Sequence, residues 1–166
     1  MKHVISALVE NKSGVLARVS GMFSARGFNI DSLAVGKTDD PAVSRMTIVT
    51  EGDERTLEQI IKQLYRLIDV IRVQDITEQD YIDRELILIK VNITSQNRPE
   101  IIQIVDTFKG RIVDVSPRTL TVEASGERSK IEAIIKLLSS FGLREIVRTG
   151  QIAISRKKEV TIKNNC

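Results

Sequence analysis

The amino-acid sequence predicts an α+β protein made of two βαββαβ sandwiches in tandem. The first observation behind this prediction is that short runs rich in β-branched residues alternate with segments whose apolar residues recur at helical spacing. The second is that the order strand, helix, strand, strand, helix, strand occurs twice, with a period of roughly 75 residues. The third is composition: 166 residues, of which 42% are hydrophobic and 28% charged, suit two small globular domains rather than a disordered chain.

The first half of the chain contains each element of this pattern in order. In its helices the apolar residues form one stripe, Gly27 suits a left-handed cap at the end of the first helix, and Asp53 is a candidate N-cap of the second. The motif Asp39-Asp40-Pro41 is typical of a hairpin turn. The predicted elements are a strand at 3–9, a helix from Val15 to Gly27, strands at 29–38 and 44–52, a helix after Asp53 and a strand at 70–76.

The second half repeats the pattern with its own punctuation. Pro99 stands in the first turn of a helix, where a missing N–H is tolerated. The predicted elements are a strand at 84–93, a helix at 99–108, strands at 111–117 and 119–125, a helix at 127–141 and a strand at 144–154. We therefore expect a ferredoxin-like domain at 1–77, a second at 78–156 and a polar tail at 157–166, with the join near Thr77 to Asp83.

Charge and cysteine content indicate where the protein works. Lys and Arg number 25 and Asp and Glu 22, which gives a net charge of +3, and the two signs are interleaved along most of the chain. The single cysteine, Cys166, cannot form an internal disulfide, and the N-terminal segment turns polar too early for a signal peptide. No apolar run is long enough to span a membrane. We therefore expect a cytoplasmic protein without membrane contact.

The sequence contains no recognisable catalytic or metal-binding motif. His3 is the one histidine, and the sequence has no CxxC pair, no P-loop and no GxGxxG motif. We interpret His3 as an incidental residue at the start of a strand, and Asp39 and Asp40 as turn residues. We therefore expect no catalytic residue, no metal site and no cofactor in this chain.

The βαββαβ pattern also raises an RNA-binding alternative. RNA-recognition motifs of this topology stack bases on aromatic side chains of their central strands. Here the strands at 44–52 and 119–125 carry no aromatic residue, and the whole chain has four Phe, two Tyr and no Trp. The interleaved charges also lack the basic face that such binding requires. We therefore expect no nucleic-acid partner.

The loop between the first strand and the first helix is the candidate binding site. Free N–H groups and the macrodipole at a helix N-terminus favour an anion such as a carboxylate, and Gly14 lets a ligand approach the backbone. Asn11 adds a donor and an acceptor suited to an amino acid. The alternative is that Asn11 or Ser13 merely caps the helix. The residues alone leave both interpretations open.

These residues also carry a resemblance to a known family. The segment VENKSGVLARVSGMFSARGFNIDSLAVG at 9–36, followed by SRMTIVTEGD at 44–53 and by the paired second half, resembles the regulatory small subunits of acetolactate synthase, also called acetohydroxyacid synthase. The resemblance covers nearly the whole chain, from Lys2 to Arg156. It implies that the first half is an ACT domain. In ACT domains, amino acids bind at dimer interfaces between this loop and a neighbouring strand.

The resemblance implies an effector site that two subunits share. One subunit would supply Asn11, Gly14, Val15 and Leu16, and its partner would supply Asn29 and Ile30. Backbone N–H groups at the helix start would hold the effector's carboxylate, the two Asn amides its polar ends, and the apolar residues a branched side chain such as that of valine. The second half has ITSQNRPEII at the equivalent position, where Pro99 removes an N–H and glycine is absent, so we expect no effector site there.

The function that the resemblance implies is regulatory rather than catalytic. The chain would form a homodimer, bind the large catalytic subunit of acetolactate synthase, raise its activity and confer feedback inhibition by a branched-chain amino acid, with valine as the expected effector. Thiamine diphosphate, FAD and Mg²⁺ would belong to the catalytic partner. The competing possibility is a free-standing ACT-domain amino-acid sensor without an enzyme partner.

Overall fold

The computed structural model describes residues 1–156, which form two compact units. Of these residues, 1–82 and 153–156 make up the first unit and 83–152 the second. The change of unit after Ile82 falls within the charged stretch in which the sequence analysis expects the join. The predicted polar tail at 157–166 lies outside the described residues.

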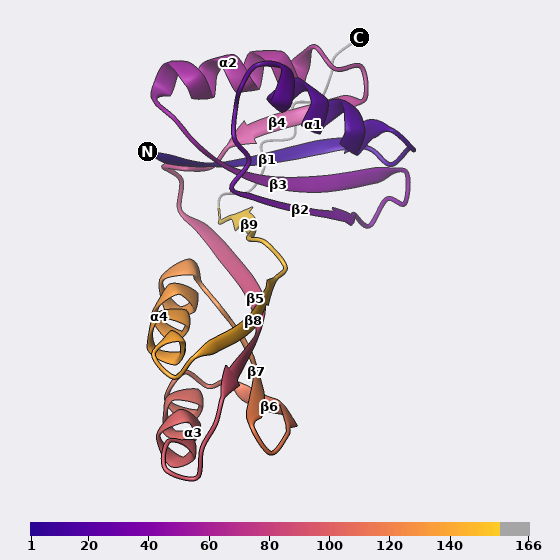
Figure 1. Ribbon diagram of the computed structural model, residues 1–166. Coiled ribbons are helices and arrows are strands. Elements are labelled where there is room, and N and C mark those ends of the chain that lie inside the picture. Colours follow the sequence, from indigo (N-terminus) through magenta and orange to yellow (C-terminus); the bar gives the residue numbers. More distant parts are fainter. Residues whose placement is uncertain (157–166) are drawn as a thin grey trace. The chain divides into compact units, whose positions relative to one another are not determined.

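The first unit is a four-stranded antiparallel sheet with two helices on one face (Figure 1). Its elements are β1 (Lys2–Glu10), α1 (Val15–Ala25), β2 (Ser32–Lys37), β3 (Val43–Glu51), α2 (Glu54–Tyr65) and β4 (Val70–Asp75). The strand order is β2-β3-β1-β4. The first half of the predicted βαββαβ pattern is thus confirmed element by element, including the left-handed Gly27 after α1 and the Asp53 cap of α2.

Alternation along the strands places one set of apolar side chains under the two helices. Ile5 of β1 pairs with Ile48 of β3, and both are fully buried against α1 and α2 residues such as Phe23 and Leu64. The opposite face of the same strands presents Val4 and Val49, which pack with further residues of this unit in a small second cluster. The main core therefore lies between the sheet and the two helices, and Val15 at the start of α1 belongs to it.

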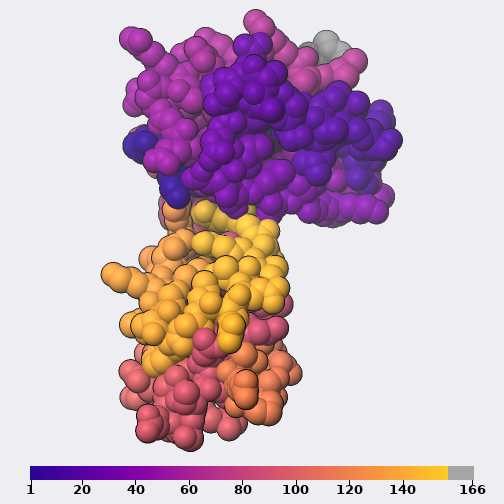
Figure 2. All heavy atoms as spheres, viewed as in Figure 1, coloured from indigo at the N-terminus to yellow at the C-terminus, as the bar shows by residue number. Residues whose placement is uncertain are grey.

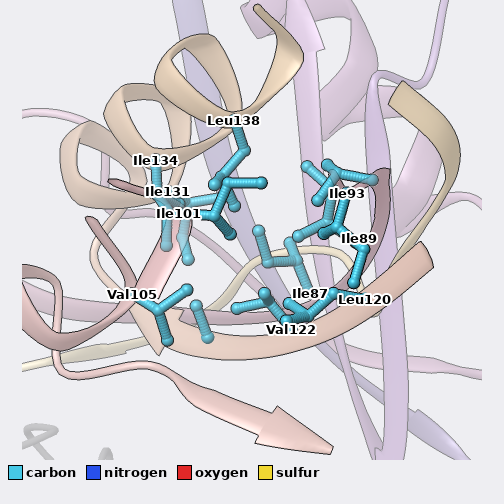
Figure 3. Packing of buried hydrophobic residues seen from close by; sticks show 12 residues of the cluster. Ile87, Ile89, Ile93, Ile101, Val105, Leu120, Val122, Ile131, Ile134 and Leu138 are labelled. Carbon is cyan, nitrogen blue, oxygen red and sulfur yellow. The ribbon is translucent and has the colours of Figure 1, made fainter. Parts of the chain in front are cut away.

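The second unit repeats this arrangement in residues 83–152. Its elements are β5 (Tyr81–Asn92), α3 (Arg98–Thr107), β6 (Arg111–Val115), β7 (Thr119–Gly126), α4 (Arg128–Ser139) and β8 (Leu143–Arg148). The strand order is β6-β7-β5-β8. Figure 3 shows the buried side chains of α3 and α4 lying over those of β5 and β7, with Ile101 and Ile134 facing Ile89 and Val122.

The last predicted strand, at 144–154, is wrong as a single element. The structure divides it into β8 and a separate β9 (Ile152–Ser155). Gly150 between them has φ +83°, a left-handed conformation that breaks strand geometry. β9 pairs with β5 and places Ala153 in the small cluster with Val4 and Val49. β9 thus belongs to the second sheet through its pairing with β5, whereas its residues from Ala153 to Ser155 belong to the first unit.

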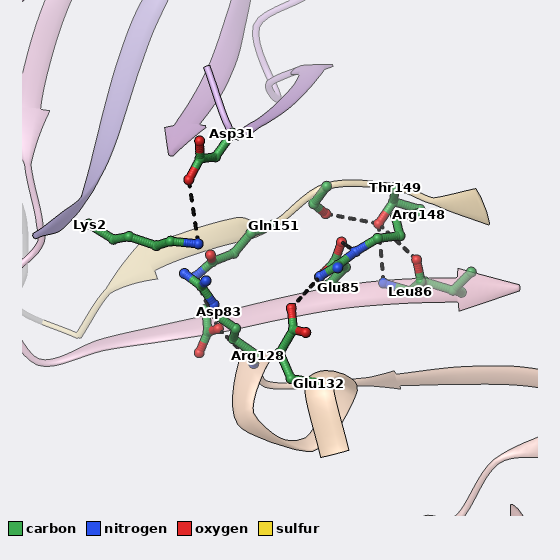
Figure 4. Close-up of polar contacts among 11 residues, drawn as sticks. Lys2, Asp31, Asp83, Glu85, Leu86, Arg128, Glu132, Arg148, Thr149 and Gln151 are labelled. Carbon is green, nitrogen blue, oxygen red and sulfur yellow. Dashed lines mark hydrogen bonds and ion pairs between the residues drawn. The ribbon is translucent and has the colours of Figure 1, made fainter. Parts of the chain in front are cut away.

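Charged side chains fix the ends of β8 and α4 in the second unit (Figure 4). Arg148 donates from Nε and Nη2 to the buried Glu85 carboxylate at 2.8 and 2.7 Å, and the pKa of Arg148 is raised mainly by this pair. Asp83 accepts hydrogen bonds from the Arg128 N–H, in the first turn of α4, and from Gln151 Nε2. These bonds join the start of β5 to the start of α4 and the end of β8.

Tyr65 closes one edge of the first sheet. Its hydroxyl donates to the carbonyl of Val73 (2.9 Å) and accepts from the N–H of Val73 (3.2 Å), so these backbone groups of the edge strand β4 are occupied. An edge strand with unpaired backbone groups is a template for another strand. Tyr65 blocks that use of β4, while β2 forms the opposite edge of the sheet.

Replacing Tyr65 with Phe should expose the edge of β4. Loss of the hydroxyl returns the Val73 N–H and carbonyl to water, and we expect the free energy of unfolding to fall by about 1 kcal/mol in urea denaturation. Amide hydrogen exchange at Val73 should accelerate more than exchange at buried β1 residues. Unchanged exchange at Val73 would contradict the role given to Tyr65.

The Asp53 cap should make the stability of α2 depend on pH. Hydrogen bonds from the side chain and backbone N–H of Thr56 lower the pKa of Asp53 from its ordinary 3.8, so this stabilisation is present above pH 3.8 and is lost as pH falls through the lower folded-state pKa. Asp53→Ala should lower the thermal midpoint at pH 7. The difference in thermal midpoint between this variant and the native protein should become smaller below pH 3.8. Asp53→Asn serves as the control, because it keeps a capping oxygen that does not titrate. If the difference in thermal midpoint between Asp53→Ala and the native protein does not change with pH, the assignment is contradicted.

Candidate functional site

The loop that joins β1 to α1 turns on Gly14. This residue is the N-cap of α1 and has φ +85°, a conformation that residues with a Cβ rarely adopt. A Cβ at this position would also lie 3.0 Å from Nη1 of Arg18. Both constraints favour glycine at this position.

The start of α1 has no side-chain cap. Neither Asn11 nor Ser13 caps it, because the capping residue is Gly14, so the alternative interpretation of these two residues is wrong. The Arg18 N–H donates to the Gly14 carbonyl at 3.0 Å, and the N–H groups of the preceding turn, from Val15 onward, have no partner within the helix. The first turn also lacks acidic residues. This helix end can therefore receive an anion.

Lys12 adds a positive charge to the loop but is already paired. Its ammonium contacts the Glu10 carboxylate, and this hydrogen bond is the main reason that the pKa of Lys12 is raised. The pair lies at the exposed end of β1, where solvent screens it. The backbone N–H groups and the helix dipole therefore remain the principal attraction for an anion at this loop.

Asn11 is held against the tip of the β2–β3 hairpin. Its side-chain Nδ2 donates to the carbonyl of Pro41 (2.8 Å), and its backbone N–H donates to the carbonyl of Ala42 (2.7 Å). Asp40 fixes this tip in turn, because its carboxylate accepts from the Ala42 N–H at 2.9 Å. With one N–H of its side chain bonded to Pro41, Asn11 presents the amide oxygen as an acceptor that suits an ammonium group.

Asn29 lies at the entrance to β2 and is also held in place. Its Nδ2 donates to Oδ1 of Asp31 at 2.7 Å, and its carbonyl accepts from the Thr50 hydroxyl at 2.6 Å. Asp31 is paired with Lys2 (3.4 Å), as Figure 4 shows. The amide oxygen of Asn29 is therefore oriented as a second acceptor on a fixed segment.

The apolar residues predicted for the effector's side chain differ in exposure. Val15 is 3% exposed and belongs to the main core of the first unit, so its side chain is committed there and only its backbone faces the loop. Leu16 is 47% exposed on α1, which lies at the surface in indigo and purple in Figure 2. Ile30 is half-buried and packs against the edge of the same core. Leu16 and Ile30 thus have apolar surface to offer.

The structure places the two groups of predicted site residues at opposite ends of the sheet. Asn11 bonds to Ala42, just before β3 begins, whereas Asn29 bonds to Thr50 near its end. At about 3.3 Å per residue, the eight steps from Ala42 to Thr50 span about 26 Å. Asn11, Gly14, Val15 and Leu16 are therefore brought together within one chain, and Asn29 and Ile30 are not brought to them.

Two residues that were not predicted from the sequence, Arg18 and Asp69, form an ion pair next to the loop. Arg18 donates from Nε to the Asp69 carboxylate at 2.6 Å, and Asp69 lies in the turn between α2 and β4. Arg18 is four residues after Gly14, so helical spacing could have placed it one turn above the glycine. No local signal in the sequence connects Arg18 with Asp69, because this contact is made only by the fold.

The equivalent loop of the second unit is closed on itself. The Thr94 N–H donates to Oδ1 of Asn97 (2.7 Å), and the Asn97 N–H donates back to the Thr94 hydroxyl (3.2 Å). Pro99 then occupies the first turn of α3, as predicted. A shallow hollow of about 290 Å³ does lie on the open sheet face of this unit, but its Lys90 is already paired with Glu145. The first unit therefore carries the candidate site.

Two other kinds of functional feature are absent from residues 1–156. No helix in this range is long and apolar enough to cross a membrane. No group of three or more His, Cys, Asp or Glu side chains in the same range is placed to hold a metal ion.

Comparisons with known proteins match both units. Residues 5–72 match the family model for the AHAS small subunit-like ACT domain, and residues 84–157 match the model for the small subunit of acetolactate synthase. The probable acetolactate synthase small subunit of Methanothermobacter thermautotrophicus is 54% identical over 93% of this chain and 92% of its own length. The acetolactate synthase small subunit of Aquifex aeolicus is 44% identical over 99% of this chain and 86% of its own length.

A solved structure agrees with these matches. The crystal structure of the acetolactate synthase small subunit from Thermotoga maritima has a TM-score of 0.85 and 42% identity, and the match covers 95% of this chain and 98% of that one. Similarity at this level over nearly the full length extends to both units and to their order. The chain therefore belongs to the family of acetolactate synthase small subunits, which are regulatory and non-catalytic, and its first unit is an ACT domain.

Proposed function

We propose that this regulatory subunit activates the catalytic subunit of acetolactate synthase and makes it sensitive to a branched-chain amino acid, L-valine, bound between two copies of the chain. The observation that carries the proposal is the uncapped start of α1 behind Gly14, in the loop that also holds Asn11. Asn29 and Ile30, which lie at the far end of the sheet, would come from the second copy.

The chemistry of the loop fits an amino acid. The N–H groups of the first turn of α1 would hold the carboxylate, since this turn combines free donors with the positive end of the helix dipole. The amide oxygens of Asn11 and of Asn29 of the partner subunit would accept from the ammonium group. Leu16 and Ile30 of the partner subunit would contact a short branched side chain, and this contact would favour valine, leucine and isoleucine over polar amino acids.

Strand pairing gives the homodimer a defined route. In an antiparallel pair, residues that face the neighbouring strand alternate with residues that face away. The Thr38 N–H donates to the Val43 carbonyl at 2.9 Å, so the backbone groups of Val35, an odd number of residues away, face the outer edge of β2. Because Tyr65 occupies the edge of β4, a second copy would add to the sheet at β2.

An isologous β2–β2 pairing would also assemble the site. Two copies of β2 related by a two-fold axis run antiparallel, so the start of one strand lies beside the end of the other. The end of β2 and the Gly14 loop are at the same end of the sheet, because Lys37 pairs with Ser44 and Val9 pairs with Ser44 on the other side. The partner's Asn29 would thus arrive at the end of the sheet that carries the loop.

A shared site offers a physical basis for regulation. An effector changes an equilibrium only through different affinities for two states, and a ligand held by both subunits favours the arrangement in which the two halves meet. Thiamine diphosphate, FAD and Mg²⁺ would be bound by the catalytic partner, and the proposal does not include their binding by this chain. A cytoplasmic location remains a prediction.

Replacing Gly14 with Asp should abolish inhibition by valine while activation of the catalytic subunit survives. The new side chain and its negative charge would stand where the effector's carboxylate is proposed to bind. The measurement is acetolactate formation by the reconstituted complex during titration with valine, leucine and isoleucine. Gly21→Asp adds the same charge in open space on α1 and should leave inhibition intact.

The outcomes of this titration separate the components of the proposal. Retained valine sensitivity in Gly14→Asp would contradict the site. A native complex that none of the three amino acids inhibits would contradict the regulatory proposal itself. If the chain binds an amino acid but never raises the activity of the catalytic subunit, it is a free-standing sensor.

Replacing Val35 with Pro should weaken the dimer without breaking the sheet. Proline removes an N–H that faces the outer edge of β2, so the intrachain pairing with β3 loses no donor. We expect the dimer dissociation constant to rise at least about tenfold, because the β2–β2 interface loses a hydrogen bond and the two strands pair less closely. Analytical ultracentrifugation measures this constant. Val35→Thr keeps the N–H and serves as the control. An unchanged dissociation constant for Val35→Pro would place the interface elsewhere.

A further inference from the structure

Asp69 contacts the chain on both sides of the Gly14 loop. Its backbone carbonyl accepts from the N–H of Glu10 at 2.8 Å, at the last residue of β1. Its carboxylate accepts from Nε of Arg18 at 2.6 Å, in the second turn of α1. One residue of the turn between α2 and β4 thus holds the segment that enters the loop and the segment that leaves it.

The pair between Arg18 and Asp69 is partly removed from solvent. The Asp69 side chain is 9% exposed, whereas that of Arg18 is 48% exposed. A buried carboxylate that loses its cation stays uncompensated, so the burial of Asp69 favours keeping Arg18 in this position. The contact is therefore a stronger constraint on Arg18 than a fully exposed ion pair such as Glu58–Lys62 on α2.

Arg18 in turn lies against the glycine of the loop. Nη1 of its guanidinium is 3.0 Å from the point that a Gly14 Cβ would occupy. Nε faces Asp69 at the same time, so the planar guanidinium spans the space between the buried carboxylate and the left-handed residue. The first turn of α1 is thus fixed to the α2–β4 turn at the point where its free N–H groups begin.

We propose that the Arg18–Asp69 ion pair is a positioning device for the effector loop, which sets how tightly the loop binds an amino acid. This inference rests on the proposed function. A loop that is already ordered binds with less entropic cost than one that must be fixed by the ligand. Arg18 and Asp69 are positioning residues here, because they act through Gly14, Glu10 and the start of α1.

The test is a double-mutant cycle in the reconstituted complex. Arg18→Met removes the guanidinium but keeps most of the apolar stem, and Asp69→Asn removes the charge but keeps the backbone carbonyl that holds Glu10. The probe is L-valine, and the measured quantity is the concentration that halves acetolactate formation. Activity without valine and the thermal midpoint of each free chain are measured in parallel.

Each single variant should raise the half-inhibitory valine concentration at least about tenfold, the size of effect expected from loss of a charge-assisted hydrogen bond. The double variant should raise the half-inhibitory concentration little further, because both changes break the same Arg18–Asp69 ion pair. Activation of the catalytic subunit should stay within about twofold of native. A merely structural role would instead reduce activation in parallel with valine sensitivity. The thermal midpoint of Arg18→Met should fall in either case, because the Asp69 carboxylate loses its cation.

The matched control is the exposed ion pair on α2. Glu58 and Lys62 are joined at 2.7 Å and are remote in sequence from the loop, so Glu58→Gln with Lys62→Met should leave the half-inhibitory concentration unchanged. Suppose that Gly14→Asp abolishes inhibition by valine, whereas Arg18→Met and Asp69→Asn keep the native half-inhibitory concentration. The positioning role of the ion pair is then overturned and the proposed function stands. If valine does not inhibit the native complex at all, the proposed function is wrong, and so is the positioning role that rests on it.

Discussion

The strand order of the first sheet is the constraint on which the proposed regulation depends. β1 and β2 lie on either side of β3 and run parallel to each other, so the end of β1 and the start of β2 are at opposite ends of the sheet. The Gly14 loop follows the first of these points and Asn29 precedes the second. A single chain therefore cannot bring the two groups of residues to one ligand. A two-fold pairing of β2 strands could, and the proposed effector binding would then be a property of the dimer.

The same fold occurs twice, and local chemistry distinguishes the two copies. In the first unit, glycine at the helix start leaves backbone donors without a cap, and the hairpin tip holds Asn11 of the same loop in place. In the second unit, Thr94 and Asn97 bond to each other, and proline follows in the first turn of the helix. Small changes in one loop thus separate a candidate binding unit from a unit without that site. In the first unit the Arg18–Asp69 pair also joins the start of α1 to the turn between α2 and β4.

The fold was predictable because its elements depend on local patterns. Apolar periodicity, the Asp53 cap and the left-handed glycines determined every element of the first unit, whereas the last strand failed because Gly150 divides an otherwise uniform β-rich run. The site was predictable only in part. Asn11 and Gly14 share one loop, but the burial of Val15 in the core and the contact of Arg18 with Asp69 depend on packing between distant segments. A pattern read along the chain does not contain such contacts.

The most direct test of the central claim is to mix two defective chains. A chain carrying Gly14→Asp keeps its Asn29, and a chain carrying Asn29→Ala keeps its Gly14 loop, so their heterodimer should hold one intact site while neither homodimer holds any. Valine binding is measured by isothermal titration calorimetry on each chain alone and on a mixture that has exchanged subunits. The account predicts no binding by either variant alone and recovery of about a quarter of the native sites in an equal mixture, as random pairing in a two-fold dimer requires. A mixture that binds no more valine than the separate chains would contradict a site shared between subunits.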